Sequence, residues 1–338
     1  MEFLADYGLF LAKTATFVTA FLILLGAGIA VSTKGGDKDK KKLRIKKLND
    51  RYQTMADTLK TAALSKKERK LAHKAEKKQQ KLKQKSGDIE NRRRIFVVNF
   101  NGDIRAHAVE QLRDAITAIL TVATPKDEVV ICLESGGGVV HGYGLGASQL
   151  RRVRDRGIPL TVIIDKVAAS GGYMMACVAD HIIAAPFAFI GSVGVLVQLP
   201  NFHRLLKQKH VDFEQLSAGE FKRTLSLFGE NTRQGREKLQ QEIDETHDIF
   251  KAFVKENRPQ LDIDKIATGE HWLGTQALRL NLIDKISTSD DYLLNASETA
   301  DLYSVEYKAK KKLGDKLAGQ ANSFMNRILT SWHNETMV

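Results

Sequence analysis

From residue 95 onwards, short apolar runs alternate along the chain with longer amphipathic stretches. Apolar runs bounded by turn or charged residues predict buried strands, and apolar positions three or four residues apart predict helices. Strands are predicted in IFVVNF (95–100), DEVVICLE (127–134), IPLTVIID (158–165), HIIAAP (181–186), the loop-and-strand FIGSVGVLVQ (189–198) and VDFEQLSA (211–218). Helices are predicted at 107–124, 144–157, 172–179, 202–210 and 232–257. This alternation favours an α/β fold with a mainly parallel sheet.

Residues 1–32 differ from this pattern because they form one long apolar segment. Residues 14–32 carry no charge, and with YGLFLA before Lys13 the apolar span of about 25 residues is long enough to cross a hydrocarbon core about 30 Å thick. A cleaved signal peptide would have a basic start and a shorter apolar core, whereas this start carries Glu2 and Asp6. We therefore expect an uncleaved N-terminal transmembrane anchor, with residues 8–31 crossing a bacterial inner membrane once.

The excess positive charge lies in residues 33–94, which hold 23 Lys and Arg against 8 Asp and Glu. Apolar side chains recur there at loose helical spacing, which predicts a polar, partly helical spacer. Its lysines either bind anionic lipid head groups, at about 1 kcal/mol each near the surface, or form a solvated linker. Residues 95–338 hold 28 basic against 30 acidic residues, so the folded part has no basic excess. Nucleic-acid binding is therefore not supported.

The sequence predicts neither a metal nor a cofactor. Cys132 and Cys177 lie inside apolar runs, and we expect both to be buried thiols. The spacings show no metal-binding motif and no disulfide framework. The glycine-rich loop after the second strand lacks the Lys-Ser/Thr of a phosphate-binding loop and the spacing of a dinucleotide fingerprint.

Three loops of small residues follow predicted strands, which is where α/β folds place their sites. They are ESGGGVVHG (134–142), AASGGY (168–173) and FIGSVGV (189–195). Consecutive glycines let a ligand approach the backbone closely and leave N–H groups free. The first loop therefore fits either an oxyanion hole or an ordinary tight turn.

Ser170 lies in the second loop between small residues that would let a substrate carbonyl approach its hydroxyl. A helix starting after it would add a free N–H at Gly171 and the positive end of the helix dipole. Ser170 is thus a candidate nucleophile, with a helix N-cap as the alternative. A nucleophilic serine needs a base within reach. His141 could supply it in a Ser–His–Asp triad, or a desolvated lysine could act instead.

These loops, with AGEFKRT (218–224) and ATGEHWLGTQALRLNLID (267–284), resemble the S49, signal peptide peptidase A-type, serine peptidases. The resemblance covers nearly the whole chain and is weaker in the basic spacer and the tail. It implies a ClpP/crotonase-like domain at 95–300, followed by a basic tail at 301–338, and assembly into a homo-oligomer. The first loop departs from the family pattern because Gly136 stands where a proline is common, so a fixed φ is lost.

The resemblance also implies a Ser–Lys dyad. Carried over motif by motif, Ser170 is the nucleophile and Lys222, in AGEFKRT, is the general base. Backbone N–H groups near Gly137 and at Gly171 would form the oxyanion hole. Ser192 would hydrogen-bond Lys222 and orient it.

These features predict a membrane-anchored serine endopeptidase that cleaves peptides or unfolded membrane-associated segments through an acyl-enzyme. One alternative is a crotonase-type acyl-CoA enzyme, which would use carboxylates as acid or base. The only carboxylate residue in the three loops is Glu134. Another is a non-catalytic scaffold of the same fold. The basic residues after the apolar span indicate a cytoplasmic domain by the positive-inside rule, whereas the family resemblance points outside the cytoplasm. We expect the cytoplasmic side.

Overall fold

The computed structural model describes residues 7–8, 10–20, 42–71, 74 and 92–308. The chain divides into two compact units, of which the larger comprises Leu43–Lys308. Half of the expected membrane span at 8–31, residues 9 and 21–31, lies outside the described residues, and so does the tail from residue 309. Among the described stretches, no helix is both long enough and apolar enough to cross a membrane.

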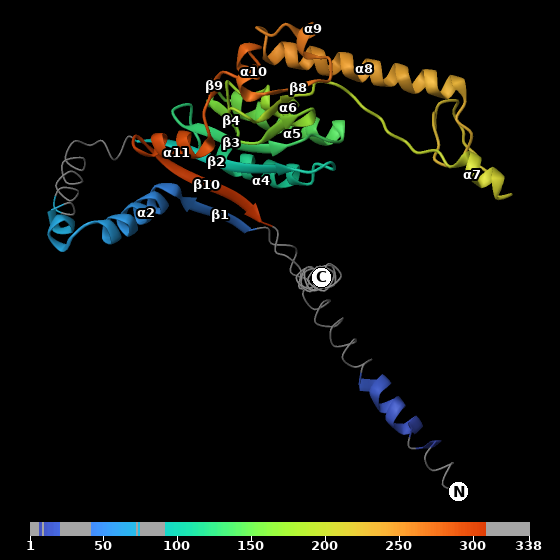
Figure 1. Ribbon diagram of the computed structural model, residues 1–338, viewed down its shortest axis with the longest axis horizontal. Coiled ribbons are helices and arrows are strands. Elements are labelled where there is room, and N and C mark those ends of the chain that lie inside the picture. Colours follow the sequence, from blue (N-terminus) through green and yellow to red (C-terminus); the bar gives the residue numbers. More distant parts are fainter. Residues whose placement is uncertain (1–6, 9, 21–41, 72–73, 75–91, 309–338) are drawn as a thin grey trace, which may run out of the picture. The chain divides into compact units, whose positions relative to one another are not determined.

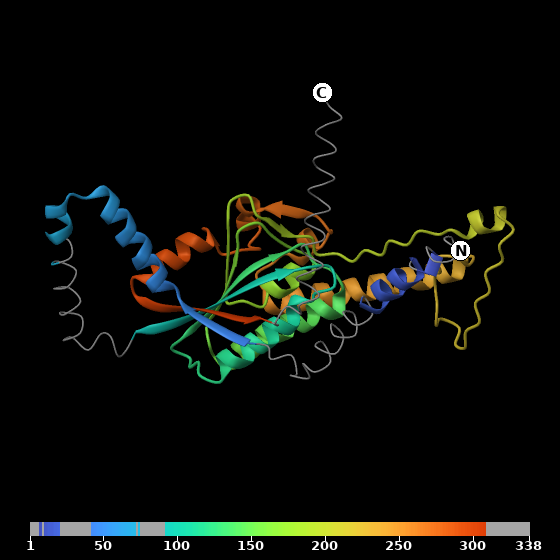
Figure 2. The ribbon, with the colours of Figure 1, turned by 90° about the horizontal axis from the view of Figure 1, so that it is seen from below.

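A sheet forms the centre of the larger unit (Figures 1 and 2), with the strand order β1-β10-β2-β3-β4-β6-β9. These strands are β1 (Lys42–Lys47), β2 (Arg93–Gly102), β3 (Glu128–Ser135), β4 (Leu160–Ile164), β6 (His181–Ala184), β9 (Lys285–Ile286) and β10 (Ala300–Lys308). All pairs from β10 across to β9 are parallel. Strands covered on both faces read as continuous apolar runs, as β2, β3 and β4 do. The predicted α/β fold with a mainly parallel sheet is confirmed.

Helices cover both faces of this sheet (Figure 1). The helices of the larger unit are α2 (Leu48–Ala63), α4 (Ala108–Leu120), α5 (Val140–Arg154), α6 (Gly171–Ala176), α8 (Arg233–Asn257), α9 (Ile263–Ile266), α10 (Gly274–Arg279) and α11 (Ser289–Ser297), together with α7 (His203–Gln208), which lies away from the sheet. Alternate residues of β2 explain the two layers. Phe96 and Val98 join the large core with α4, α5 and α6, whereas Ile95 and Val97 join a smaller core with α2 and α11.

A second, smaller strand layer brings the three small-residue loops together. It consists of β5 (Val167–Ala169), β7 (Phe189–Gly191) and β8 (His271–Leu273), with β5 also paired to the end of β3. In this register Ser135 lies opposite Ala168, and Ala169 lies opposite Gly191. The chain ends of β3, β5 and β7 therefore meet, and each runs directly into one of the loops.

Two expected strands do not form. The chain from 192 to 202 and VDFEQLSA at 211–218 have no strand structure, and Leu216 is 96% exposed. In both views this segment, with α7, extends away from the sheet (Figures 1 and 2). We call residues 195–231 the arm. Its apolar residues find no neighbouring strand within the described chain, so the apolar pattern alone misassigned them.

The folded unit also begins earlier than expected. The boundary near residue 95 assigned everything before it to a spacer, yet β1 lies beside β10 and Leu48 and Tyr52 pack on the smaller core. Asn49 fixes this packing: its side chain donates to the carbonyls of Ser297 and Ala300, at 3.1 and 2.9 Å. Within the segment expected to be a spacer, residues Leu48–Ala63 form the helix α2.

Candidate active site

Ser170 occupies the turn between β5 and α6 in a backbone conformation that non-glycine residues rarely adopt. Its φ is 52°, held by a hydrogen bond from its N–H to the carbonyl of Gly191 (2.7 Å). The N-cap alternative predicts a side-chain bond to the helix, but the Ser170 side chain makes none. Among the described residues, the hydroxyl has no hydrogen-bond partner. The turn thus presents a half-buried, unbonded hydroxyl.

The first glycine loop lies against this turn. A Cβ added to Gly137, whose φ is +89°, would come within 2.7 Å of the Gly171 nitrogen and 2.8 Å of the Ser170 Cβ. Only glycine permits this approach. The Gly137 N–H itself donates to Ser135 Oγ at 3.1 Å, so it is already used. The N–H of Gly138 has no acceptor among the described residues, and Gly171, as the first helical residue, has no intrahelical acceptor.

Ser192 lies in the third loop and also has a φ of 52°. Its hydroxyl donates to the carbonyl of Gly269 at 3.1 Å, and its N–H donates to the carbonyl of Glu270 at 2.7 Å. The oxygen of Ser192 can still accept a hydrogen bond from an amine. Its expected role of orienting Lys222 stays a prediction.

Ser170 and Ser192 line one cavity of about 960 Å³ together with Gly136, Gly138 and His141. One wall comes from α8 through Leu239, Glu242, Ile243 and Thr246. This spacing places the four side chains on one helix face. The rest of the lining is largely aliphatic and includes Ile104, Val139, Val140, Leu196 and Val197. The cavity is therefore a mainly apolar cleft that also presents serine hydroxyl and glycine N–H groups, which suits an extended peptide chain.

Lys222 lies on the arm and is exposed. It lines a different cavity, of about 730 Å³, whose other lining residues include Phe213, Leu216, Leu227 and Phe228. The single chain therefore does not bring Lys222 and Ser170 into one site. His141, the alternative base, lines the Ser170 cavity. The α8 wall was missed from the sequence, because no local signal tells which helix packs across the loops.

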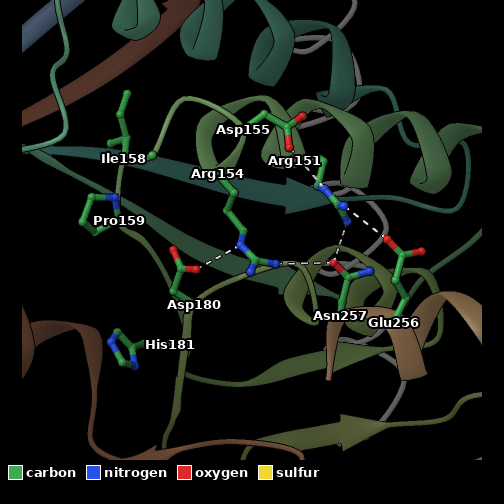
Figure 3. A pocket seen from close by; sticks show the side chains of 10 residues that line it. Arg151, Arg154, Asp155, Ile158, Pro159, Asp180, His181, Glu256 and Asn257 are labelled. Carbon is green, nitrogen blue, oxygen red and sulfur yellow. Dashed lines mark hydrogen bonds and ion pairs between the residues drawn. The ribbon is translucent and has the colours of Figure 1, made fainter. Parts of the chain in front are cut away.

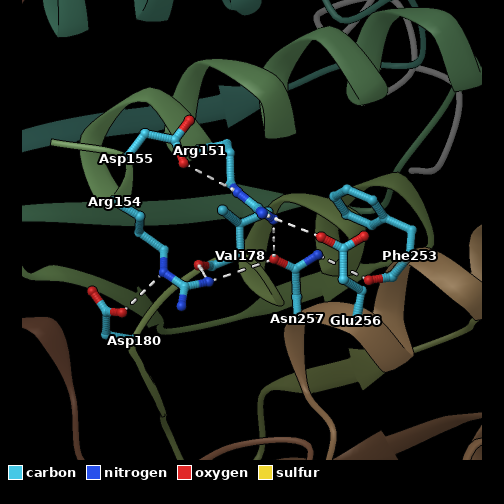
Figure 4. A network of polar contacts seen from close by, with 8 residues as sticks. All are labelled: Arg151, Arg154, Asp155, Val178, Asp180, Phe253, Glu256 and Asn257. Atoms are coloured by element: carbon cyan, nitrogen blue, oxygen red, sulfur yellow. Dashed lines mark hydrogen bonds and ion pairs between the residues drawn. The ribbon is translucent and has the colours of Figure 1, made fainter. Parts of the chain in front are cut away.

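A further cavity of about 510 Å³ lies at the C-terminal ends of α5 and α8 (Figure 3). Its charged side chains are paired with one another. Arg151 reaches Asp155, Glu256 and Asn257, at 3.3, 3.2 and 3.1 Å, and Arg154 pairs with Asp180 at 2.9 Å (Figure 4). This network joins α5 to the C-terminal end of α8. It thereby fixes the helix whose N-terminal half forms the wall of the Ser170 cavity.

Neither thiol is suited to act as a nucleophile. Both cysteines are unpaired, and Cys177 is buried as expected, while Cys132 is partly buried. Burial raises the pKa of each thiol to about 12, so both stay protonated at neutral pH. In the described part of the chain, no group of three or more His, Cys, Asp or Glu side chains could hold a metal ion.

Comparisons with known proteins identify the family. The sequence matches "Peptidase family S49 N-terminal" over residues 2–150 and "Peptidase family S49" over residues 152–303. It is 49% identical over 340 residues to a probable protease SohB of Haemophilus influenzae, covering 97% of this chain and 96% of the relative. It is 47% identical to a probable protease SohB of Buchnera aphidicola subsp. Schizaphis graminum, covering 92% of each chain.

Among solved structures, the chain is similar to a variant of the 1510-N membrane-bound stomatin-specific protease in complex with a substrate peptide. The TM-score is 0.41 and the identity 15%, over 69% of this chain and 99% of that chain. The sequence matches, which extend over nearly the whole chain, show that this protein belongs to peptidase family S49 and is a serine-type peptidase.

Proposed function

We propose that the protein is a membrane-anchored serine endopeptidase in which Ser170 is the nucleophile and Lys222 the general base. The observation that carries this proposal is the strained turn at Ser170. In the described part of the chain, its hydroxyl has no hydrogen-bond partner and the N–H groups of Gly138 and Gly171 have no acceptor; Ser170 and Gly138 line the same apolar cleft, and Gly171 follows Ser170 directly. These are the parts that acyl transfer requires.

The reaction proceeds in two halves. The Ser170 oxygen attacks the peptide carbonyl while its proton passes to Lys222, and the N–H groups of Gly138 and Gly171 stabilise the negative oxygen that forms. Lys222 then protonates the leaving amine, and the peptide carbon–nitrogen bond breaks to leave an acyl-enzyme. Water, deprotonated by the same amine, hydrolyses this ester and restores Ser170.

Lys222 must approach Ser170 for this chemistry, and exposed apolar residues on the arm suggest the route. Leu216 and its apolar neighbours on the arm are exposed, which is unusual for a protein that stays monomeric. We propose that copies of the chain assemble through their arms, and that assembly places a Lys222 beside each Ser170. A lysine acts as a base in its neutral form, which burial away from water favours.

The proposed substrates are peptides or unfolded, membrane-associated protein segments. A cleft with a mainly aliphatic lining suits an extended chain better than a folded surface. The apolar N-terminal segment would hold the enzyme in the bacterial inner membrane, where such segments occur. Because the basic residues follow the span, we propose a cytoplasmic catalytic domain. Digestion of residues 95–338 by protease added to right-side-out spheroplasts would contradict that placement.

The test compares the two candidate bases in one peptidase assay. Ser170→Ala and Lys222→Ala should each abolish hydrolysis without lowering the thermal midpoint, and the double variant should be no worse, because the two residues act as a unit. Lys222→Arg should also be inactive, since a guanidinium stays protonated. His141→Ala should keep most activity.

Two results would reject parts of this account. An inactive His141→Ala with an active Lys222→Ala assigns the base to His141. An active Ser170→Ala removes the nucleophile. The acyl-CoA alternative has lost its support because the sequence matches are to peptidases. A non-catalytic scaffold predicts no hydrolysis by the wild-type protein.

A further inference from the structure

Tyr143 on α5 is a buried polar side chain placed between the two loops of the candidate site. Its exposed fraction is 0%, and Ser135, at the end of β3, is 2% exposed. Buried hydroxyls are retained where they make hydrogen bonds, so the partners of this pair indicate what it does. Burial raises the pKa of Tyr143, which keeps its hydroxyl protonated and able to donate.

The two hydroxyls form a directed chain of hydrogen bonds. Tyr143 donates its single proton to the carbonyl of Asp103 at 2.8 Å. Because the Tyr143 proton is used in this bond, the Ser135 hydroxyl donates to the Tyr143 oxygen at 2.5 Å, a shorter contact than its other acceptor, the carbonyl of Gly102 at 3.4 Å. The Ser135 oxygen in turn accepts the N–H of Gly137 at 3.1 Å. Each hydroxyl thus donates once and accepts once, and the chain ends on the glycine loop.

The ring of the same tyrosine supports the other loop. A Cβ added to Gly171 would come within 2.4 Å of the Tyr143 ring, so the Gly171 backbone rests directly on that ring. Gly171 carries one of the two unused N–H groups beside Ser170. Tyr143 therefore contacts both halves of the proposed oxyanion hole, by its hydroxyl on one side and its ring on the other.

The glycine loop needs such a support. It contains no proline, and a Cβ at Gly136 would meet nothing within 4 Å, so packing does not restrain that residue. Gly137 sits at a φ of +89°, in the left-handed region where glycine is most flexible when unrestrained. The bond from its N–H to Ser135 fixes the peptide plane that precedes the free N–H of Gly138.

We propose that Tyr143 is a positioning residue for catalysis, which aligns the N–H groups of Gly138 and Gly171 through the Ser135 hydroxyl and through its own ring. Substrate does not contact it. It acts mainly on the transition state, because the two N–H groups bind the oxygen much more strongly once it becomes negative. This proposal rests on the proposed role of Ser170.

The test uses Tyr143→Phe in the full-length protein and measures kcat, KM and the inhibition constant of a peptide aldehyde. The aldehyde adds the Ser170 O–H across its C=O bond, and the resulting oxygen occupies the oxyanion hole. Loss of the hydroxyl should lower kcat about ten- to hundred-fold and weaken aldehyde binding by the same factor, with KM within two-fold. A purely structural role would not produce this split.

Tyr173→Phe is the matched control. Tyr173 is equally buried, and its hydroxyl donates to the carbonyl of Leu282 at 3.0 Å, away from the glycine loop. It should keep kcat within two-fold. The proposal is overturned if Tyr143→Phe keeps kcat, or loses kcat without losing aldehyde affinity. If that variant does not fold, Ser135→Ala decides by the same readouts. An active Ser170→Ala would instead refute the nucleophile, whatever Tyr143 does.

Discussion

At the scale of single residues, strain and close approach define the site. Ser170 and Ser192 both hold a φ of 52°, and Gly137 lies so near the Ser170 turn that a methyl group would not fit. The sequence predicts the loops, because runs of glycine and serine after apolar strands are visible locally. It does not predict the left-handed serines, since their conformation is imposed by the pairing of β5 with β7.

The two glycines of the first loop should respond differently to the same substitution. Gly137→Ala should abolish peptide hydrolysis and lower the thermal midpoint, because its Cβ would strike backbone atoms of Ala169 and Gly171. Gly136→Ala is the control, since its Cβ meets open space and its φ is not positive. Steady-state kinetics and thermal unfolding of both variants check this. Equal activity of the two would contradict the close approach.

At the scale of elements, prediction succeeded where the pattern is local. The long amphipathic helix expected at 232–257 is α8, Arg233–Asn257, begun by Thr232, whose side chain accepts the N–H of Gly235 at 3.1 Å. Prediction failed for the arm, because apolar residues there resemble a strand but have no neighbour in the described chain. An apolar pattern indicates that side chains are buried, but it does not show whether they are buried within the same chain or against another copy.

The arm should matter for assembly rather than for folding of the chain. Leu216→Asp should give a monomer in light scattering and should lose peptide hydrolysis. Its thermal midpoint should fall only by the amount that dissociation of the oligomer accounts for. Ile249→Asp is the control, because Ile249 is 71% exposed on α8 and lies outside the arm. A monomeric wild-type protein at micromolar concentration with full activity would remove the assembly claim.

At the scale of the whole molecule, the class of fold could be predicted from the sequence, but the extent of the folded unit could not. The strand order could not be predicted, because β10 at the end of the domain inserts between β1 and β2. The contribution of β1 and α2 was missed, because few apolar side chains, such as Leu48 and Tyr52, stand among many lysines and give no clear apolar pattern. Long-range ion pairs were equally unpredictable: Arg258, 4% exposed at its side chain, binds Asp284 at 2.7 Å, although 26 residues separate them.

These pairs predict loss of stability in acid. Burial raises the pKa of Asp284, but hydrogen bonds from Arg258 and the Ile182 N–H outweigh it, so the pKa lies below its usual value. Asp127, bonded to Arg94 and Thr124, behaves likewise. The unfolded chain then binds more protons near pH 4, so stability present above that pH is lost as pH falls.

Thermal unfolding between pH 6 and about pH 3 measures this loss. Asp284→Asn should start less stable, because it leaves the buried Arg258 without its charge partner, but should lose less on acidification. An equal loss in both proteins would show that Asp284 does not carry the pH dependence.

The identity of the nucleophile is the central claim, and covalent labelling tests it most directly. A serine-reactive phosphonate incubated with the full-length protein, followed by peptide mass spectrometry, should give one adduct on Ser170. Ser170→Ala should give no adduct, and peptide hydrolysis should fall in parallel with labelling. An adduct on Ser192, or full peptidase activity after Ser170 has been modified, would contradict the account.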